Sequence, residues 1–166
     1  SGLGGGAFLV WYDAESGELT TLDGRETAPL AATPILFQTE DGEPMGFFDA
    51  VVGGRSVGTP GTPALLEAAH RRWGRTEWPR LFDASADLAR NGFVVSPRLA
   101  GLVERDVERL ASDPVSPAYF LPGGARVKAG DLLTNVEYAK TVEALAQGGA
   151  RAFDTGQNSA AIVEKV

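Results

Sequence analysis

The sequence predicts one β-hairpin near its N-terminal end, and the rest of the chain reads as loop and helix. Ala7–Tyr12 (AFLVWY) is a short apolar run rich in strand-forming residues, and we expect it to be a buried strand. The turn residues of Asp13–Gly17 lead into a returning strand over Glu18–Asp23. Because two strands alone do not form a stable sheet, we expect both to be inner strands of a sheet whose other members lie outside these 166 residues.

A long loop and about five helices are expected after the hairpin. Residues 30–61 contain six glycines and three prolines, which favours loop. Beyond them, Thr62 is expected to cap a helix that Gly74 ends, and Ser96-Pro97 is expected to open another. Residues 113–130 are expected to be a connection rich in proline and glycine. The expected helices cover residues 63–73, 79–90, 97 to about 110, 135–147, and a stretch that begins near 157.

Composition excludes several classes of function. The net charge of −7 argues against a nucleic-acid partner, because an acidic surface repels phosphate. No apolar run approaches the roughly 20 residues that span a bilayer. The absence of cysteine excludes disulfides, thiolate metal sites and a cysteine nucleophile. His70 is the single histidine, so a mechanism with two imidazoles is excluded, and its place near a helix end indicates a surface or capping role.

Two motifs match functional patterns only in form, and an acidic cluster does not match one. Gly2–Ala7 fits G-x-G-x-x-G/A, but a strand follows it and none precedes it, so we interpret these glycines as allowing close approach of another backbone or ligand. Gly54–Gly58 fits G-x-S-x-G around Ser56, but no helix follows directly, so a glycine-rich turn is expected. The acidic residues of the hairpin tip do not fit a calcium loop, and no metal is expected there.

Arg25 is the candidate ligand-binding residue. It lies in DGRETAP, between the second strand and Pro29. A guanidinium held at a strand end can bind a carboxylate through two parallel hydrogen bonds, which lysine does poorly. An ion pair with Asp23 or Glu26 is the structural alternative, and the residues alone leave both interpretations open.

Several segments in this order resemble one family. They are SGLGGGAFLVWYD, DGRETAP, SVGTPGTPALLEAAHRRWG, LARNGFVVSPRLA and YFLPGG. Together they resemble the large-subunit region of the gamma-glutamyltransferases, also called gamma-glutamyltranspeptidases or glutathione hydrolases, over essentially all 166 residues. The resemblance implies an α+β fold, a partial αββα sandwich of the N-terminal-nucleophile hydrolases. Residues 1–166 are then a single incomplete domain cut from a longer chain.

The resemblance also implies an activity. Such enzymes cleave the γ-glutamyl amide bond of glutathione and related compounds, and transfer the γ-glutamyl group to water or to amino acid or peptide acceptors. The nucleophile is an N-terminal threonine on the small subunit, activated by its own α-amine. No threonine of this chain lies in such a motif, so we expect no catalytic residue here and no activity of the chain alone. Arg25 corresponds to the arginine that binds the substrate α-carboxylate.

The remaining expectations concern partners and place. No cofactor or metal is implied, and the partners are the γ-glutamyl substrates, the remainder of the large subunit and the small subunit of the same precursor. The expected location is periplasmic or secreted. Alternatives are a non-catalytic binding or structural module, or a related amidohydrolase such as a cephalosporin acylase or a poly-γ-glutamate-processing enzyme.

Overall fold

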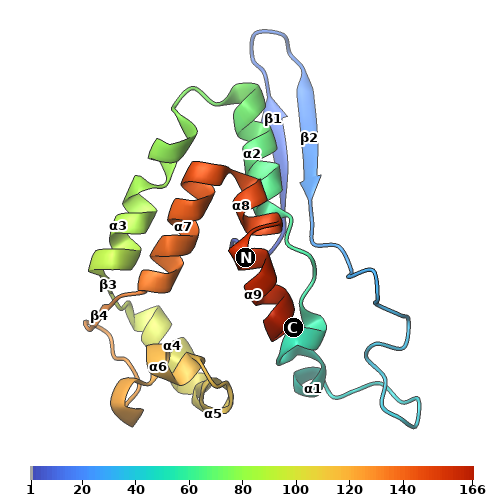
Figure 1. The fold of residues 1–166 in the computed structure, drawn as a ribbon, viewed down its shortest axis with the longest axis vertical. Coiled ribbons are helices and arrows are strands. Elements are labelled where there is room, and N and C mark those ends of the chain that lie inside the picture. The colour runs from blue at the N-terminus through green and yellow to red at the C-terminus, as the bar shows by residue number, and fades with distance from the viewer. Residues whose placement is uncertain (1) are drawn as a thin grey trace. The chain divides into compact units, whose positions relative to one another are not determined.

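The computed structural model describes residues 2–166, and the chain divides into two compact units. The first contains the residues up to Arg80 together with Ala144–Val166, and the second is Leu81–Glu143. Both units mix helices with a two-stranded sheet, so the expected α+β class is confirmed (Figure 1). The expectation of a single incomplete domain over residues 1–166 stays a prediction.

The hairpin of the first unit forms where the sequence predicts it. Strands β1 (Ala7–Tyr12) and β2 (Leu19–Gly24) pair antiparallel, with Ala7 opposite Gly24. Helix α2 (Thr62–Trp73) packs against both strands (Figure 1). The indole of Trp11 stacks on that of Trp73 with ring centroids 4.9 Å apart. One face of the hairpin therefore has an apolar partner.

The expectation that β1 is a buried strand is wrong for the described residues. Phe8, Val10 and Tyr12 are 68%, 66% and 61% exposed. Side chains alternate between the two faces of a strand, and α2 covers only the face that carries Trp11. The apolar pattern of β1 on both faces is that of a strand covered on both sides. The expected further strands of its sheet stay a prediction.

Helix α2 ends as expected but begins differently. Gly74 follows its last residue, and the ring of His70 lies 2.7 Å from the Thr76 carbonyl, which confirms a structural role for this histidine. The predicted cap at Thr62 is wrong, because the N-cap position is Gly61 and no side chain caps the helix. The Thr62 hydroxyl donates instead to the carbonyl of Gly5, on another segment.

Residues 30–61 are mostly irregular, as predicted. They contain one short helix, α1 (Phe47–Val51), and one 3₁₀ turn, η1 (Gly54–Ser56). The guanidinium of Arg55 donates to the Leu36 carbonyl at 2.9 Å and lies 3.3 Å from the sulfur of Met45. Arg55 thereby joins two parts of this loop.

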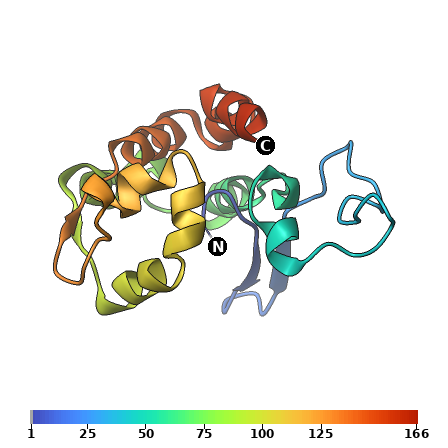
Figure 2. The ribbon, with the colours of Figure 1, turned by 90° about the horizontal axis from the view of Figure 1, so that it is seen from below.

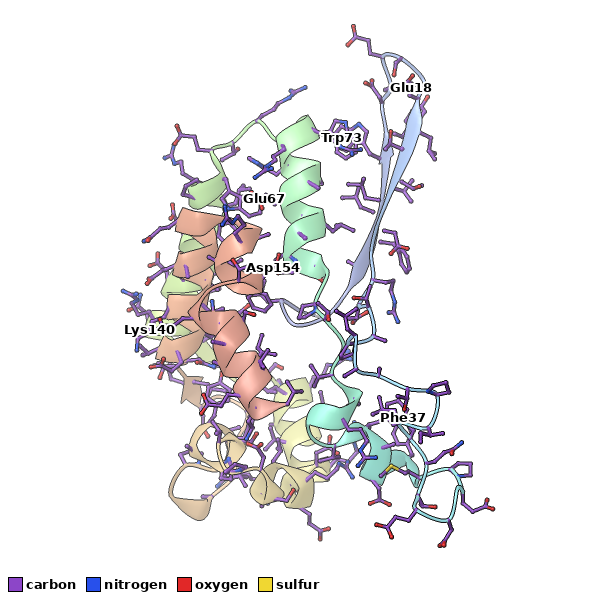
Figure 3. The ribbon with its side chains drawn as sticks, turned by 45° about the vertical axis from the view of Figure 1, so that its right-hand side comes forward. Glu18, Phe37, Glu67, Trp73, Lys140 and Asp154 are labelled. Atoms are coloured by element: carbon purple, nitrogen blue, oxygen red, sulfur yellow. The ribbon has the colours of Figure 1, made fainter. Side chains whose placement is uncertain are left out.

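The C-terminal part of the chain, from the end of α7 (Val136–Gly148) through α8 (Ala150–Asp154) and α9 (Gln157–Lys165), completes the first unit, whereas residues 136–143 of α7 belong to the second. Helix α7 starts after Asn135 as predicted, and the Asn135 carboxamide accepts the Tyr138 N–H at 2.8 Å. Helix α8 was not expected, whereas α9 was. Figure 3 shows Glu67 of α2 beside Asp154 of α8. The Glu67 carboxylate accepts the first N–H of α8 at 2.9 Å, which the sequence pattern does not reveal.

The second unit is helical apart from a small sheet. Its core contains Val95, Val103, Val127 and Leu133, each at most 7% exposed. Figure 2 views the short helices of this unit from below. Its elements are α3 (Asp83–Asn91), β3 (Phe93–Val94), α4 (Pro97–Arg105), α5 (Val107–Ser112), α6 (Ser116–Phe120), η3 (Pro122–Gly124), β4 (Leu132–Leu133) and the first part of α7.

Two expected helices are divided in the structure. The helix expected over residues 79–90 is a 3₁₀ turn, η2 (Trp78–Leu81), followed by α3, and the one expected from Pro97 to Leu110 breaks at Asp106 into α4 and α5. The start of α4 is confirmed, since the Ser96 hydroxyl accepts the Leu99 N–H at 3.1 Å. None of the helices within residues 2–166 combines the length and apolar character needed to cross a membrane.

Candidate functional site

Arg25 lies directly after the last residue of β2. Its backbone N–H donates to the Asp23 carboxylate at 2.9 Å, which shapes the chain as it leaves the strand. Its side chain is 61% exposed. A guanidinium carries five N–H donors in a planar fork. Arg25 can therefore present donors to a ligand in solution.

Glu26 is the charged neighbour of this guanidinium. Its Oε2 lies 3.4 Å from a terminal nitrogen of Arg25 and is buried, with no hydrogen bond to it from the described residues. The pKa of the Glu26 carboxyl is lowered, chiefly by its own backbone N–H and further by the Arg25 guanidinium, against the opposing effect of partial burial. The carboxylate is thus charged at neutral pH. The structure therefore contains the Arg25–Glu26 contact that was expected as the alternative, and the Arg25 side chain stays 61% exposed.

Three glycine-rich segments meet at Arg25, and we call this meeting point the glycine crossing. The segments are residues 5–6, 24–27 and 58–62. Thr27 and Thr59 form an isolated antiparallel bridge, with the Thr59 N–H donating to the Thr27 carbonyl at 2.8 Å. The N–H groups of Gly61 and Thr62 both donate to the Gly5 carbonyl at 3.1 Å. The motifs GLGGG, DGRETAP and VGTPGT are therefore neighbours in space.

At two of these glycines another backbone segment lies so close that a side chain would not fit. A Cβ on Gly6 would lie 2.6 Å from the Glu26 nitrogen and 2.7 Å from the Arg25 Cα. A Cβ on Gly61 would overlap the Gly24 carbonyl oxygen. The steric interpretation of the first glycine motif is thus confirmed at Gly6. At Gly2 and Gly4 a Cβ would have no neighbour within 4 Å among the described residues, so close approach there stays a prediction.

A cavity of about 330 Å³ lies beside Arg25. Its lining includes Thr27, Thr59, and Ala64 and Leu65 of α2. A larger cavity of about 690 Å³ has mainly apolar walls and does not include Arg25. Its arginine, Arg55, is already engaged with the loop, so the smaller cavity is the better place for an anionic ligand.

The other sequence candidates have structural roles. The Ser56 hydroxyl donates to the Val51 carbonyl at 2.9 Å inside a tight turn, and this confirms the glycine-rich turn. Asp13 accepts the backbone N–H groups of Glu15 and Ser16, and these hydrogen bonds lower the pKa of its carboxyl. Residues 2–166 hold no group of three or more side chains arranged to bind a metal ion.

Sequence reasoning selected Arg25 as a candidate binding residue but did not predict the crossing around it. The contributions of the Gly5 carbonyl and the Thr62 hydroxyl depend on contacts across 57 positions of sequence. The signal that was available is the recurrence of glycine in three separate segments. Glycine recurs where backbones approach closely.

The fold is the α+β fold of N-terminal-nucleophile hydrolases, shown by solved relatives. The crystal structure of Helicobacter pylori gamma-glutamyltranspeptidase matches with a TM-score of 0.91 and 34% identity, over 98% of this chain and 46% of that one. A cephalosporin acylase from Bacillus halodurans matches with a TM-score of 0.78 at 22% identity, over 97% of this chain and 30% of that one, which shows a shared fold alone.

Comparison of sequences identifies the family more narrowly than the shared fold does. The family model described as gamma-glutamyltranspeptidase matches residues 1–166. The glutathione hydrolase proenzyme of Bacillus subtilis strain 168 is 38% identical over 157 residues, covering 95% of this chain and 27% of its own length. The chain belongs to the gamma-glutamyltranspeptidase family, and it spans about a quarter of the length of that curated relative.

Proposed function

We propose that this chain is the part of a gamma-glutamyltransferase that binds the α-carboxylate of the substrate through Arg25. The observation that carries the proposal is the exposed guanidinium of Arg25 at the glycine crossing, beside a cavity of about 330 Å³. A planar fork of donors suits a carboxylate better than a point charge does. Family membership supports the reaction class.

The proposed reaction cleaves a γ-glutamyl amide. Glutathione and related γ-glutamyl compounds are the proposed substrates, and water or an amino acid or peptide is the acceptor. The nucleophile is proposed to be an N-terminal threonine of a small subunit cut from the same precursor, whose own α-amine takes the proton from the hydroxyl. Within this scheme residues 1–166 supply binding and scaffold, and the chain alone is inactive. A γ-glutamyl anilide turnover by the 166-residue chain that one threonine-to-alanine change abolishes would contradict this.

The role of Arg25 is tested with two substrates that differ only in the α-carboxylate. The full-length enzyme is assayed with a γ-glutamyl anilide and with the 4-aminobutyryl anilide, which lacks that carboxylate. We expect Arg25→Lys to raise the KM for the γ-glutamyl substrate about 10-fold, because one hydrogen bond to a charged group is lost. Arg25→Ala should raise it about 100-fold and should leave turnover of the 4-aminobutyryl substrate unchanged.

A matched control separates binding from a general loss of positive charge. Arg98 lies on α4 with an exposed side chain, and Arg98→Ala, which removes one positive charge just as Arg25→Ala does, should change neither KM. Equal turnover of the two substrates by the wild-type enzyme would indicate another amide substrate, as in the acylase alternative. An Arg25→Ala enzyme that keeps its preference for the α-carboxylate would refute the assignment of Arg25.

The partners and location follow from the same proposal. The exposed apolar face of β1 suits a neighbouring layer of the same precursor. We propose a periplasmic or secreted enzyme with no nucleic-acid partner. Cell fractionation of the source organism, followed by assay of γ-glutamyl anilide turnover in each fraction, tests the location.

A further inference from the structure

We infer that Thr62 is a positioning residue whose hydroxyl fixes the glycine crossing and thereby holds Arg25 in place. The consequence for substrate binding rests on the proposed function. The hydrogen bond from the Thr62 hydroxyl to the Gly5 carbonyl, which we call the pin, is itself a feature of the structure. It joins the first residue of α2 to the segment that enters β1.

The Gly5 carbonyl receives three hydrogen bonds at this point. The backbone N–H groups of Gly61 and Thr62 donate from 3.1 Å, and the Thr62 hydroxyl donates from 3.0 Å. The first N–H groups of a helix have no acceptor within their own helix. The carbonyl of Gly5 thus accepts hydrogen bonds from N–H groups at the start of α2. The partly buried Thr62 hydroxyl adds a further hydrogen bond between the two segments.

The Thr62 hydroxyl has no capping duty in its own helix. A threonine that caps a helix accepts a hydrogen bond from an N–H two or three residues later. In α2 the N-cap is Gly61 and no side-chain cap forms. The hydroxyl donates outward, so valine at position 62 would keep the shape of the side chain and remove only the pin. This makes Thr62 separable from helix stability.

Two backbone contacts carry the effect of the pin to Arg25. Gly6 follows Gly5 and lies so close under the Arg25–Glu26 peptide that a Cβ would be 2.7 Å from the Arg25 Cα. Gly61 precedes Thr62, and a Cβ on it would overlap the Gly24 carbonyl. Both segments that the pin joins therefore contact the backbone that carries Arg25. A shift of either segment moves the guanidinium.

The experiment compares Thr62→Val with Thr62→Ser in the full-length enzyme. Thr62→Val should raise the KM for a γ-glutamyl anilide about 2- to 10-fold, the range expected for one lost hydrogen bond, with kcat nearly unchanged. Thr62→Ser keeps the hydroxyl and should restore the wild-type KM. Amide hydrogen exchange at Gly61 and Thr62 should be faster by a similar factor in Thr62→Val.

Thr141→Val is the matched control. Its hydroxyl also donates to a backbone carbonyl, that of Glu137 at 3.2 Å, but within α7. It should change neither the KM nor the exchange at Gly61. Unchanged KM in Thr62→Val, or a Thr62→Ser enzyme as impaired as Thr62→Val, overturns the inference. If the wild-type enzyme has no γ-glutamyl activity, the proposed function fails, and exchange at Gly61 that is unaffected by Thr62→Val then overturns the pin separately.

Discussion

Replacing Gly6 by alanine should displace Arg25 and lower activity sharply. The new Cβ would lie 2.6 Å from the Glu26 nitrogen and 2.7 Å from the Arg25 Cα, whereas ordinary contact begins at 3.4 Å. The Glu26 Oε2 atom, at 2.5 Å, could rotate away, but these two obstructing atoms belong to the backbone, so no side-chain rotation relieves them. Relief therefore requires the Arg25–Glu26 peptide or the strand entrance to move by about 0.8 Å, because protein interiors have little free space.

The magnitude follows from this shift. A misplacement of about 1 Å at a binding group can cost about 100-fold in rate. We expect Gly6→Ala in the full-length enzyme to lower kcat/KM for a γ-glutamyl anilide by about 100-fold. Crowding in a packed site should also destabilise the protein by about 1–3 kcal/mol. Initial rates and a urea titration measure the two effects.

Gly4→Ala is the matched control from the same motif. Within residues 2–166, a Cβ at Gly4 would have no neighbour closer than 4 Å, and the backbone there does not adopt a positive φ. Gly4→Ala should therefore keep both activity and stability. Wild-type kcat/KM in Gly6→Ala, or an equal loss in Gly4→Ala, would refute the claim that close approach under Arg25 is what the motif provides.

Two further predictions concern stability. Ser96→Ala should lower the free energy of unfolding by about 1 kcal/mol, because the hydroxyl that accepts the Leu99 N–H is lost, and chemical denaturation checks this. Burial, and then the charge of Glu67, raise the pKa of the Asp154 carboxyl above 3.8. Because the folded chain holds this proton more tightly, stability is lost as the pH rises through the raised pKa. Asp154→Asn should therefore raise the melting temperature at pH 7, and a gain that persists below pH 3.8 would contradict the reasoning.

Local signals in the sequence predict most elements of secondary structure. Strand β1 has its predicted bounds, and α2 ends at Gly74 as predicted. The Ser96 cap also forms. Such features depend on residues within a few positions of one another, which is why a single sequence reveals them. Arg25 could be chosen as a binding residue from its chemistry and from family resemblance.

The errors arose where neighbours distant in sequence decide the outcome. Thr62 is a residue type that often caps helices, yet its hydroxyl donates a hydrogen bond to the carbonyl of Gly5, 57 positions away. The apolar pattern of β1 predicts burial on both faces, whereas α2 covers one face among the described residues. The break of the third expected helix at Asp106 likewise has no strong local signal.

The sequence by itself determined the hairpin and several helix boundaries and selected Arg25 as a candidate binding residue, because propensity, caps and charge are local properties. The tertiary structure alone decided that three glycine-rich segments meet, which glycines must lack a side chain, and that Glu26 lies 3.4 Å from Arg25. The physical reason is that steric overlap and hydrogen bonding between segments depend on how the chain returns on itself. That path is set by packing summed over the whole fold.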